Sequence, residues 1–437
     1  MCDFLTDQQF DSELIIGLVC SVGSETKLVI DLLTERLGRA GYQVLVVKLS
    51  RDVIPALVKG IPDYDDQFER ISKLMDAGNL AREKADDDSV LALGAAARIG
   101  AGRQKRGSAG QAMRKTAIVV DSLKRPQEVE RMRLIYSSGF VLMGVHEEED
   151  RRLDHLMKNQ GISKENAQKL IQRDSEESKD KHGQRVNKTF HLADFFVRIS
   201  DNHDRLRCDV KRLVELWFGN PFITPIFDEY AMFLAFSAGL RSADLSRQVG
   251  AVVARDSQIL AAGANDCPKA GGGLYWPTPL SDGSIGDVPG GRDYTRSDGD
   301  SNRVEQNRII ERIVEDGRNP EYGFEAEKLR ELLKNSRIRD LTEFGRVVHA
   351  EMEALLCCAR NGLSTLKATL YSTTFPCHNC AKHIIAAGIS RVVCVEPYPK
   401  SKTLHFHDDS ISTGKPGEPG ELVKLEPFVG VGPRRFF

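Results

Sequence analysis

The chain has 437 residues, and its 61 lysines and arginines almost balance its 63 aspartates and glutamates. This length allows two or three domains with cores of their own. The balanced charge gives no general electrostatic footprint for nucleic acid. The longest apolar run, near Ala231–Leu240, is too short to cross a bilayer, and nine scattered cysteines without disulfide-framework spacing indicate a reducing compartment. We therefore expect a cytoplasmic protein that spans no membrane.

The N-terminal half alternates short apolar runs with helical stretches. Five of these runs are predicted as strands: Leu14–Cys20, Gln43–Leu49, Ala117–Asp121, Phe140–Val145 and Phe195–Ile199. Strands that alternate with helices predict a parallel three-layer α/β domain. A closing helix over Arg205–Phe218 is followed by Gly219-Asn220-Pro221, which is typical of a domain boundary. The first domain is therefore expected over residues 1–218.

The first strand and the turn after it resemble a nucleotide-binding P-loop. Gly17 and Gly23 would be its two glycines, followed by Ser24 and, further on, by Lys27. The motif is degenerate, because it requires four residues between the glycines and Lys-Ser/Thr directly after the second. Asp121 ends an apolar strand and resembles the acidic Mg²⁺ residue of such folds. The topology resembles the P-loop nucleotide-kinase group.

Three roles stay open for this loop. Glu25 adds negative charge where a phosphate would lie, which disfavours active phosphoryl transfer. Retained nucleotide binding is the second role, and a regulatory or scaffold role is favoured over both. A segment rich in glycine, arginine and lysine, around Arg103–Arg106, is interpreted as a mobile solvated loop. The alternative for that segment is contact with the phosphates of a nucleotide or RNA.

The C-terminal half begins with a predicted helix over Pro225–Leu240 and a hairpin that ends at Asn265, with its turn at Arg255–Ser257. An insertion over about 267–345 follows, irregular at first and then helical near Asn302–Glu315 and Glu321–Lys334. Long irregular segments of this kind are usually functional lids or disordered. Two further strands are predicted, Leu366–Ser372 and Arg391–Glu396.

Two short motifs bring together an imidazole, a carboxylate and two thiols. They are His349-Ala350-Glu351 and Pro376-Cys377-His378-Asn379-Cys380. Cys377 and Cys380 share one face if a helix begins there, and Pro376 suits such a start. A helix N-terminus lowers the pKa of a thiol and so favours the thiolate that binds metal. The pattern matches the H-x-E … P-C-x-x-C signature of zinc deaminases.

These motifs offer three zinc ligands: His349, Cys377 and Cys380. A structural zinc site normally has four protein ligands, whereas a catalytic one leaves a position for water. Water bound there can reach a pKa of roughly 7, which gives hydroxide near neutral pH. Glu351 is then suited to carry protons between water, a ring nitrogen and a leaving amine. The alternatives are a pair of core thiols, or a structural zinc completed by His378, Cys357 or Cys394.

From Leu245 to Glu396 the chain resembles the zinc-dependent cytidine and deoxycytidylate deaminases. The resemblance implies a three-layer αβα domain with a mixed sheet, placed here at 219–437. It also implies that Asn265 contacts the sugar of the nucleotide, and Arg247 is a candidate for the phosphate side. The alternative to this phosphate role is that Arg247 is a surface arginine at a helix end.

The complete layout, a degenerate P-loop domain joined to such a deaminase, resembles the bacterial anti-phage deoxycytidine nucleotide deaminases. That resemblance implies conversion of dCTP and dCMP to deoxyuridine nucleotides by a zinc-bound hydroxide. We further expect a homo-oligomer, with a regulatory RNA or nucleotide bound to the N-terminal domain.

Four other functions stay open. They are a housekeeping dCMP deaminase, a polynucleotide deaminase acting on tRNA or single-stranded DNA, a bifunctional kinase–deaminase and a non-catalytic zinc module. A polynucleotide deaminase needs a basic channel and stacking aromatic residues, and the balanced charge and 7% aromatic content disfavour it. The broken P-loop disfavours the kinase–deaminase, and an intact Glu351 disfavours the non-catalytic module.

Overall fold

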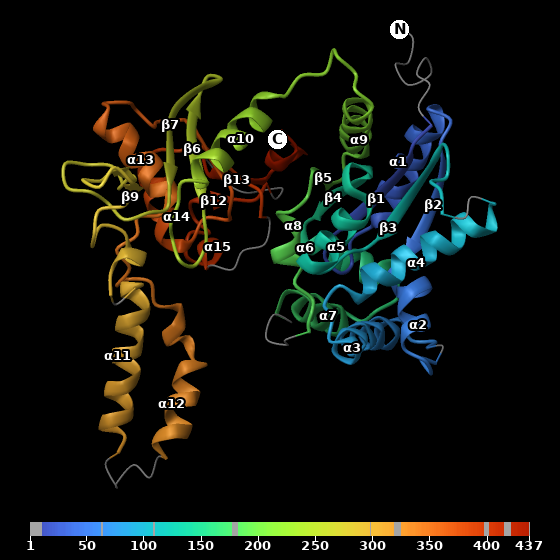
Figure 1. The fold of residues 1–437 in the computed structure, drawn as a ribbon, viewed down its shortest axis with the longest axis horizontal. Helices are drawn as coiled ribbons and strands as arrows, with labels where there is room; N and C mark the ends of the chain where they lie inside the picture. Colours follow the sequence, from blue (N-terminus) through green and yellow to red (C-terminus); the bar gives the residue numbers. More distant parts are fainter. Residues whose placement is uncertain are drawn as a thin grey trace. The chain divides into compact units, whose positions relative to one another are not determined.

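The computed structural model describes residues 11–62, 64–107, 110–176, 182–297, 299–318, 325–396, 402–414 and 421–436. The chain divides into two compact units (Figure 1). Unit 1 comprises Met1–Glu229, Glu396–Tyr398 and Pro427–Phe437, and unit 2 comprises Tyr230–Val395 and Pro399–Glu426. Each unit is built on a six-stranded sheet. None of the described helices is long and apolar enough to cross a membrane.

Among the described residues, unit 1 contains nine α-helices and the start of a tenth, together with the six strands of its sheet. In chain order its elements are β1 (Glu13–Val19), α1 (Thr26–Arg39), β2 (Gln43–Lys48), α2 (Ile54–Leu57), α3 (Gln67–Ala85), α4 (Val90–Lys105), β3 (Thr116–Asp121), α5 (Pro126–Tyr136), β4 (Phe140–Glu147), α6 (Glu149–Lys158), α7 (Lys164–Glu176), α8 (Val186–Phe190), β5 (Phe195–Ile199), α9 (His203–Trp217), the start of α10 (Phe227–Gly239), and β14 (Gly430–Val431).

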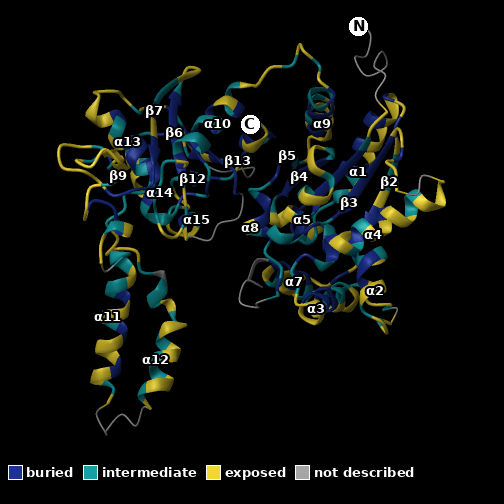
Figure 2. Ribbon diagram, viewed as in Figure 1, coloured by how far each residue is buried: buried dark blue, intermediate teal, exposed yellow. Residues whose placement is uncertain are grey.

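The sheet of unit 1 has the strand order β14-β5-β4-β1-β3-β2. The five strands predicted from the sequence pair in parallel, as expected. Every residue of β3 and β4 is buried, which explains their continuous apolar runs, because parallel strands are covered on both faces. Residues Leu14, Ile16 and Leu18 share a core with α1 and α9. Figure 2 shows β3 and β4 as buried.

Two features of this sheet differ from the sequence predictions. The strand predicted as buried over Gln43–Leu49 is β2, which lies at the sheet edge with half of its residues exposed. The other edge is β14, which pairs with β5 in the antiparallel sense. Its Val431 N–H donates to the buried Glu229 carboxylate across 2.8 Å. The segment around Arg103 is also not a loop, because α4 continues to Lys105 and Arg103 pairs with Glu13.

Unit 2 carries a mixed sheet with the order β12-β13-β11-β10-β6-β7. Its elements are the rest of α10, β6 (Gly250–Arg255), β7 (Gln258–Ala264), β8 (Thr278–Pro279), β9 (Ile285–Gly286), α11 (Ser301–Asp316), α12 (Ala326–Lys334), α13 (Ala350–Arg360), β10 (Thr369–Ser372), α14 (His378–Ala386), β11 (Arg391–Cys394), α15 (Thr403–Phe406), β12 (Ile411–Ser412) and β13 (Val423–Pro427).

The predicted hairpin is confirmed as β6 and β7, which pair antiparallel. Asp256 and Ser257 form its turn with φ values of 52° and 58°, the left-handed conformation that two-residue hairpin turns require. Helix α13 packs against both strands of the hairpin. On β6, Ala251 and Val253 join the core that includes α13 and α14, while Gly250 approaches the Ala235 carbonyl of α10. Helices therefore contact both faces of this sheet.

The insertion before α13 contains a helical hairpin in which α11 and α12 lie side by side (Figure 1). The predicted second helix begins at Ala326, and residues 319–324 lie outside the described ranges. The side-chain amides of Asn302 and Gln306 both donate to the Leu341 carbonyl at 2.7 Å. These bonds fix the chain as it returns from the hairpin toward α13.

Candidate metal centre and active site

Two helix N-termini meet at the three residues predicted as zinc ligands. His349 is the N-cap of α13, and Cys377 is the N-cap of α14, where its Sγ accepts the Cys380 N–H across 3.4 Å. A thiol in this position replaces the hydroxyl or carboxylate of an ordinary N-cap. The positive ends of both helix dipoles point at this site and favour thiolate over thiol.

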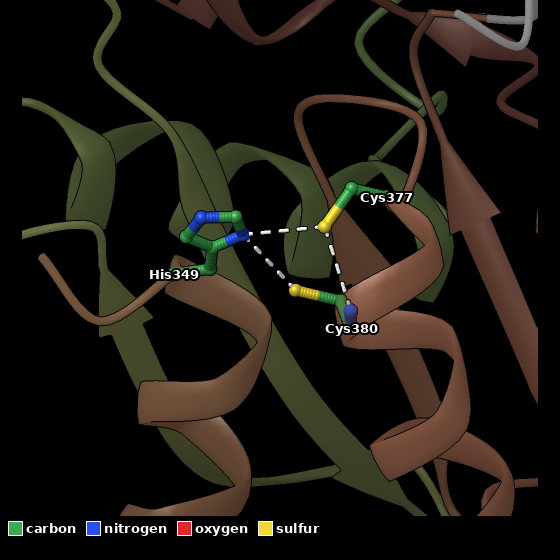
Figure 3. Close-up of side chains that lie close together, drawn as sticks. All are labelled: His349, Cys377 and Cys380. Carbon is green, nitrogen blue, oxygen red and sulfur yellow. Dashed lines mark hydrogen bonds between the residues drawn. The ribbon is translucent and has the colours of Figure 1, made fainter. Parts of the chain in front are cut away.

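The side chains of His349, Cys377 and Cys380 converge (Figure 3). His349 Nδ1 lies 3.3 Å from Cys377 Sγ and 3.4 Å from Cys380 Sγ. The three ligand atoms all lie within 4.8 Å of one another, and this is the metal-binding group found among the described residues. Nδ1 is therefore the nitrogen placed to ligate a metal.

The donor set fits zinc. A side-chain hydrogen bond from the Cys380 thiol, together with the neighbouring His349, lowers the pKa of Cys377 to about 3, so that one thiolate is already present. The same hydrogen bond raises the pKa of Cys380, whose proton a divalent cation would displace. Two sulfurs and one imidazole nitrogen are soft and borderline ligands of the kind zinc takes, and three ligands leave a fourth position open.

Glu351 lies beside this centre on the first turn of α13 and is only 3% exposed. Its Oε2 lies 3.5 Å from Cys380 Sγ, and its Oε1 lies 3.3 Å from the Ser372 hydroxyl. Burial raises the pKa of Glu351, which brings the carboxyl group closer to the range needed for proton transfer at neutral pH. Ser372 ends β10 and had not been predicted as a site residue.

The metal centre opens into a cavity of about 310 Å³, and both predicted substrate residues line it. Asn265 is buried and bridges the chain before β6: its Oδ1 accepts the Val249 N–H, and its Nδ2 donates to the Arg247 carbonyl, both at 2.7 Å. Burial lowers the pKa of Arg247, while the charge of Glu351 opposes that shift. Arg247 is therefore not a fully solvated surface arginine.

The insertion supplies part of the cavity wall, through Asp293, Asp300, Asn302 and Thr342. Thr342 Oγ1 accepts a hydrogen bond from Asn379 Nδ2 across 3.2 Å, which links the insertion to the zinc helix α14. Sequence reasoning identified the insertion as a candidate lid but named none of these residues. In the sequence, these residues are marked only by their position in the insertion between the Asn265 hairpin and the His349 motif.

The residues offered as alternative zinc ligands lie elsewhere. Cys357 is partly buried and packs against the core formed with the sheet, and Cys394 is 2% exposed at the end of β11. The imidazole of His378 packs edge-on against the Phe406 ring, with 6.0 Å between ring centroids. The metal-binding group among the described residues includes none of these side chains.

The residues predicted for the P-loop do not all come together. Gly23, Ser24 and Asp121 line a second cavity, in unit 1. Gly17 lies within β1, where an added Cβ would meet Leu123 and Phe140 at 2.9 Å, and the described lining does not include it. Lys27 is largely exposed and pairs with Asp31 across 2.8 Å, one turn along α1, so that its ammonium group does not serve the loop.

Comparison with known proteins assigns the family. Residues 225–396 match the cytidine and deoxycytidylate deaminase zinc-binding region. The chain is 33% identical to the deoxycytidylate deaminase of Mycobacterium phage D29 over 177 residues, which are 40% of this chain and 96% of that protein. It is 29% identical to the deoxycytidylate deaminase of Enterobacteria phage T4 over 171 residues, 39% of this chain and 77% of that one.

Solved structures also resemble parts of the chain. The dCMP deaminase of the cyanophage S-TIM5 in apo form is 18% identical, with a TM-score of 0.26, over 47% of this chain and 100% of that one. A gluconokinase from Sinorhizobium meliloti is 13% identical, with a TM-score of 0.27, over 49% of this chain and 98% of that one.

The α/β fold of unit 2 and its His/Cys/Cys centre with an adjacent glutamate define a zinc-dependent hydrolase. The chain belongs to the cytidine and deoxycytidylate deaminase family.

Proposed function

We propose that the protein deaminates deoxycytidine nucleotides, dCMP and dCTP, to deoxyuridine nucleotides and ammonia. The observation that carries this proposal is the buried Glu351 beside the group of His349, Cys377 and Cys380, at the end of a cavity of about 310 Å³. The relatives from the two phages, which are deoxycytidylate deaminases by name, support the choice of base and sugar.

Glu351 performs the proton transfers in this proposal. A zinc ion held by the three ligands supplies a Lewis acid that lowers the pKa of water. Glu351 accepts a proton from the attacking water and delivers it to the ring nitrogen next to the amino-bearing carbon. It then takes the proton of the hydroxyl group newly bound to that carbon and gives it to the amine. The carbon–nitrogen bond breaks, ammonia leaves and the carbonyl of the deoxyuridine nucleotide forms. A buried carboxyl group suits both halves of this task, because burial raises its pKa and so makes it a stronger base than a solvated carboxylate.

The sugar and the phosphates are assigned to the opposite part of the cavity. Asn265 lies on the wall where β7 ends, and we place the deoxyribose against it. Arg247, whose backbone carbonyl Asn265 holds, is placed at the phosphate side. Partial burial makes its charge more effective, because a guanidinium group removed from bulk water interacts more strongly with an anion.

One assay separates this proposal from the alternatives. Purified full-length protein is incubated with dCMP, dCTP, CTP and a cytosine-containing oligonucleotide, and ammonia release is followed. Faster release from dCMP or dCTP supports the proposal, whereas faster release from the oligonucleotide supports a polynucleotide deaminase. Replacing Arg247 by methionine should reduce turnover of dCMP and dCTP more than that of the nucleoside deoxycytidine. An equal reduction for all three contradicts the phosphate assignment.

For the biological role, we propose defence against phage by depletion of a DNA precursor, with unit 1 as the regulatory domain of a homo-oligomer. Unit 1 keeps five parallel strands, yet its Lys27 is exposed and pairs with Asp31 one turn along α1. We therefore expect no phosphoryl transfer, since that lysine normally contacts the β- and γ-phosphates. Such a domain is suited to binding a regulatory RNA or nucleotide that restrains deamination.

The test of this role compares bacteria expressing the wild type with bacteria expressing Glu351→Ala during phage infection. Lower plaque counts and a falling dCTP pool with the wild type alone support defence. Equal plaque counts across several phages, with unchanged dCTP pools, favour a housekeeping dCMP deaminase. Kinase activity that disappears in Lys27→Ala would contradict the regulatory assignment of unit 1.

A further inference from the structure

Unit 1 contains a cavity of its own, of about 230 Å³, which the deaminase reaction does not use. The loop between β1 and α1 forms one end of it, together with residues at the carboxyl ends of β2 and β3. Ligands of open parallel α/β sheets bind outside these strand ends. The volume lies slightly below the range usual for drug-sized ligands, so a small molecule is expected.

The loop itself is occupied by carboxylates of the chain. The Val22 N–H donates to Asp174 Oδ2 across 2.9 Å, and the Glu25 N–H donates to Glu147 Oε2 across 2.8 Å. In a phosphate-binding loop, backbone N–H groups of this kind receive phosphate oxygens. Here a polyphosphate would have to displace two anionic side chains, one of which also faces Lys124. The loop is therefore not prepared for a triphosphate.

The charged residues that line the cavity have a small positive excess. Lys124 is paired with Asp174 at 3.4 Å, and Arg82 is paired with the fully buried Glu128 at 2.8 Å. Lys48 is paired with Asp121 at 3.7 Å, so Arg70 of α3 leaves one net positive charge among the lining residues. That balance suits an anion of low charge.

Hydroxyl groups add to the polar end. Ser24 Oγ is buried, lies among the lining residues and has no hydrogen-bond partner in the described part of the chain. The Thr26 hydroxyl instead donates to Asp121 across 3.3 Å. A buried hydroxyl without a partner carries a cost that a ligand oxygen would remove.

The opposite wall is apolar. It is formed mainly by α3 and α4, through Ile71, Leu74, Met75 and Leu91, with Ile54 of α2 beside them. A ligand that fills this cavity therefore needs an apolar or ring-shaped body as well as an anionic end, because either part alone would leave one wall without a partner.

We propose that this cavity binds a phosphate monoester with a ring-shaped body, of the class of a nucleoside 5′-monophosphate. The phosphate lies at Lys48 and the Ser24 hydroxyl, and the ring lies against Leu74 and the rest of the α3 wall. Nucleoside triphosphates bind more weakly, because about four negative charges meet one net positive charge and the loop donors are already engaged. The site is separate from the zinc centre and does not depend on deamination.

The experiment is calorimetric titration of the full chain with AMP, ATP and inorganic phosphate. AMP should bind, with ATP and phosphate each at least tenfold weaker. Lys48→Met should weaken AMP binding at least tenfold, because it removes a phosphate contact while keeping the length of the side chain. Leu74→Glu should do the same by placing a negative charge on the apolar wall. Lys73→Met, on the exposed side of α3, is the matched control and should bind as the wild type does.

Three results would overturn the proposal. The first is absence of AMP binding to the wild type. The second is AMP binding that survives both Lys48→Met and Leu74→Glu, and the third is ATP binding as tight as AMP binding. Ammonia release from dCMP, measured on the same samples, reports separately on unit 2. A loss of AMP binding in Arg247→Met, with Lys48→Met unaffected, would place the nucleotide in the deaminase cavity and also contradict the proposal.

Discussion

The Ser372 hydroxyl donates a hydrogen bond to Glu351 Oε1 across 3.3 Å, and both residues are almost completely buried. Ser372 comes from the end of β10, whereas Glu351 comes from the first turn of α13. The bond holds one carboxylate oxygen against the sheet, while Oε2 stays beside the thiols. Ser372 is therefore a positioning residue for the proton carrier.

Replacing Ser372 by alanine should lower kcat by at least about tenfold, because a hydrogen bond to a charged group typically contributes about 1.5–3 kcal/mol. KM and zinc content should stay near their wild-type values, since no ligand or cavity-lining side chain is removed. Ser372→Thr keeps the hydroxyl and should retain most of the activity. Steady-state kinetics with metal analysis provide the measurement, and an unchanged kcat in Ser372→Ala would rule out this role.

Metal binding and proton transfer should separate by mutation. Glu351→Gln should keep one zinc per chain and lose at least a factor of about 10² in kcat, since the general acid and base is removed. His349→Ala should lose zinc and activity together, because only two ligands remain. Metal content by elemental analysis and ammonia release are measured on both proteins. Full zinc retention in His349→Ala would disprove the ligand assignment.

Gly263 on β7 should tolerate no side chain. A Cβ at this position would lie 2.4 Å from the Ala350 carbonyl oxygen and 2.5 Å from the Ala354 nitrogen, both backbone atoms of α13. Gly263→Ala should therefore push away the helix that carries Glu351 and reduce kcat strongly, because displacements of about 1 Å can cost on the order of 100-fold. Ala262→Ser, at the exposed neighbour, is the control. Equal kcat in both variants would contradict this packing argument.

The stability of unit 1 should decrease in mild acid through His146. Burial lowers the pKa of this histidine below its ordinary value of 6.5, although Glu148 at 3.2 Å opposes the shift. Between the lowered pKa and 6.5 the unfolded chain binds more protons than the folded one, so stability falls as the pH decreases through this window. Each unit of pKa shift corresponds to about 1.4 kcal/mol.

The check is thermal unfolding of wild type and His146→Gln at pH 7.5 and 5.5. The variant should be less stable at pH 7.5, and its unfolding temperature should fall less between the two values. Arg152 and Arg198 also influence this histidine and keep their charge throughout the range, so they do not add a titration of their own. A parallel fall in both proteins would assign the acid sensitivity to other groups.

The metal motif could be predicted from the sequence because its information is local. Cys377 and Cys380 are one helical turn apart, and the family resemblance named His349 and Glu351 together. Ser372 could not be placed, since its contact with Glu351 depends on how β10 packs beside α13. Thr342 meets Asn379 only after α11 and α12 have returned the chain to the site.

The same limits apply to the fold. A continuous apolar run, such as that of β3, predicts a buried parallel strand. The sequence of β2 is also apolar, yet β2 lies at the sheet edge. The order of strands in a sheet therefore cannot be predicted from hydropathy. The two-residue strand β14 has no pattern of its own, and its pairing with β5 joins residues far apart in the chain. The P-loop resemblance indicated a loop that lines a cavity in the structure. It did not indicate that the Asp174 and Glu147 carboxylates accept hydrogen bonds from the backbone N–H groups of that loop.

The β14 strand also sets an order of events during protein synthesis. Its partner β5 is made before any part of unit 2, while Gly430 and Val431 leave the ribosome after the zinc motif has been completed. Until then the edge of β5 is unpaired and the Glu229 carboxylate lacks the Val431 N–H, although Arg212 and the Ile226 N–H already bind it. An open strand edge invites pairing with other chains. A nascent chain stalled before Gly430 would thus combine a complete deaminase motif with an aggregation-prone edge, a form that chaperones and proteases recognise.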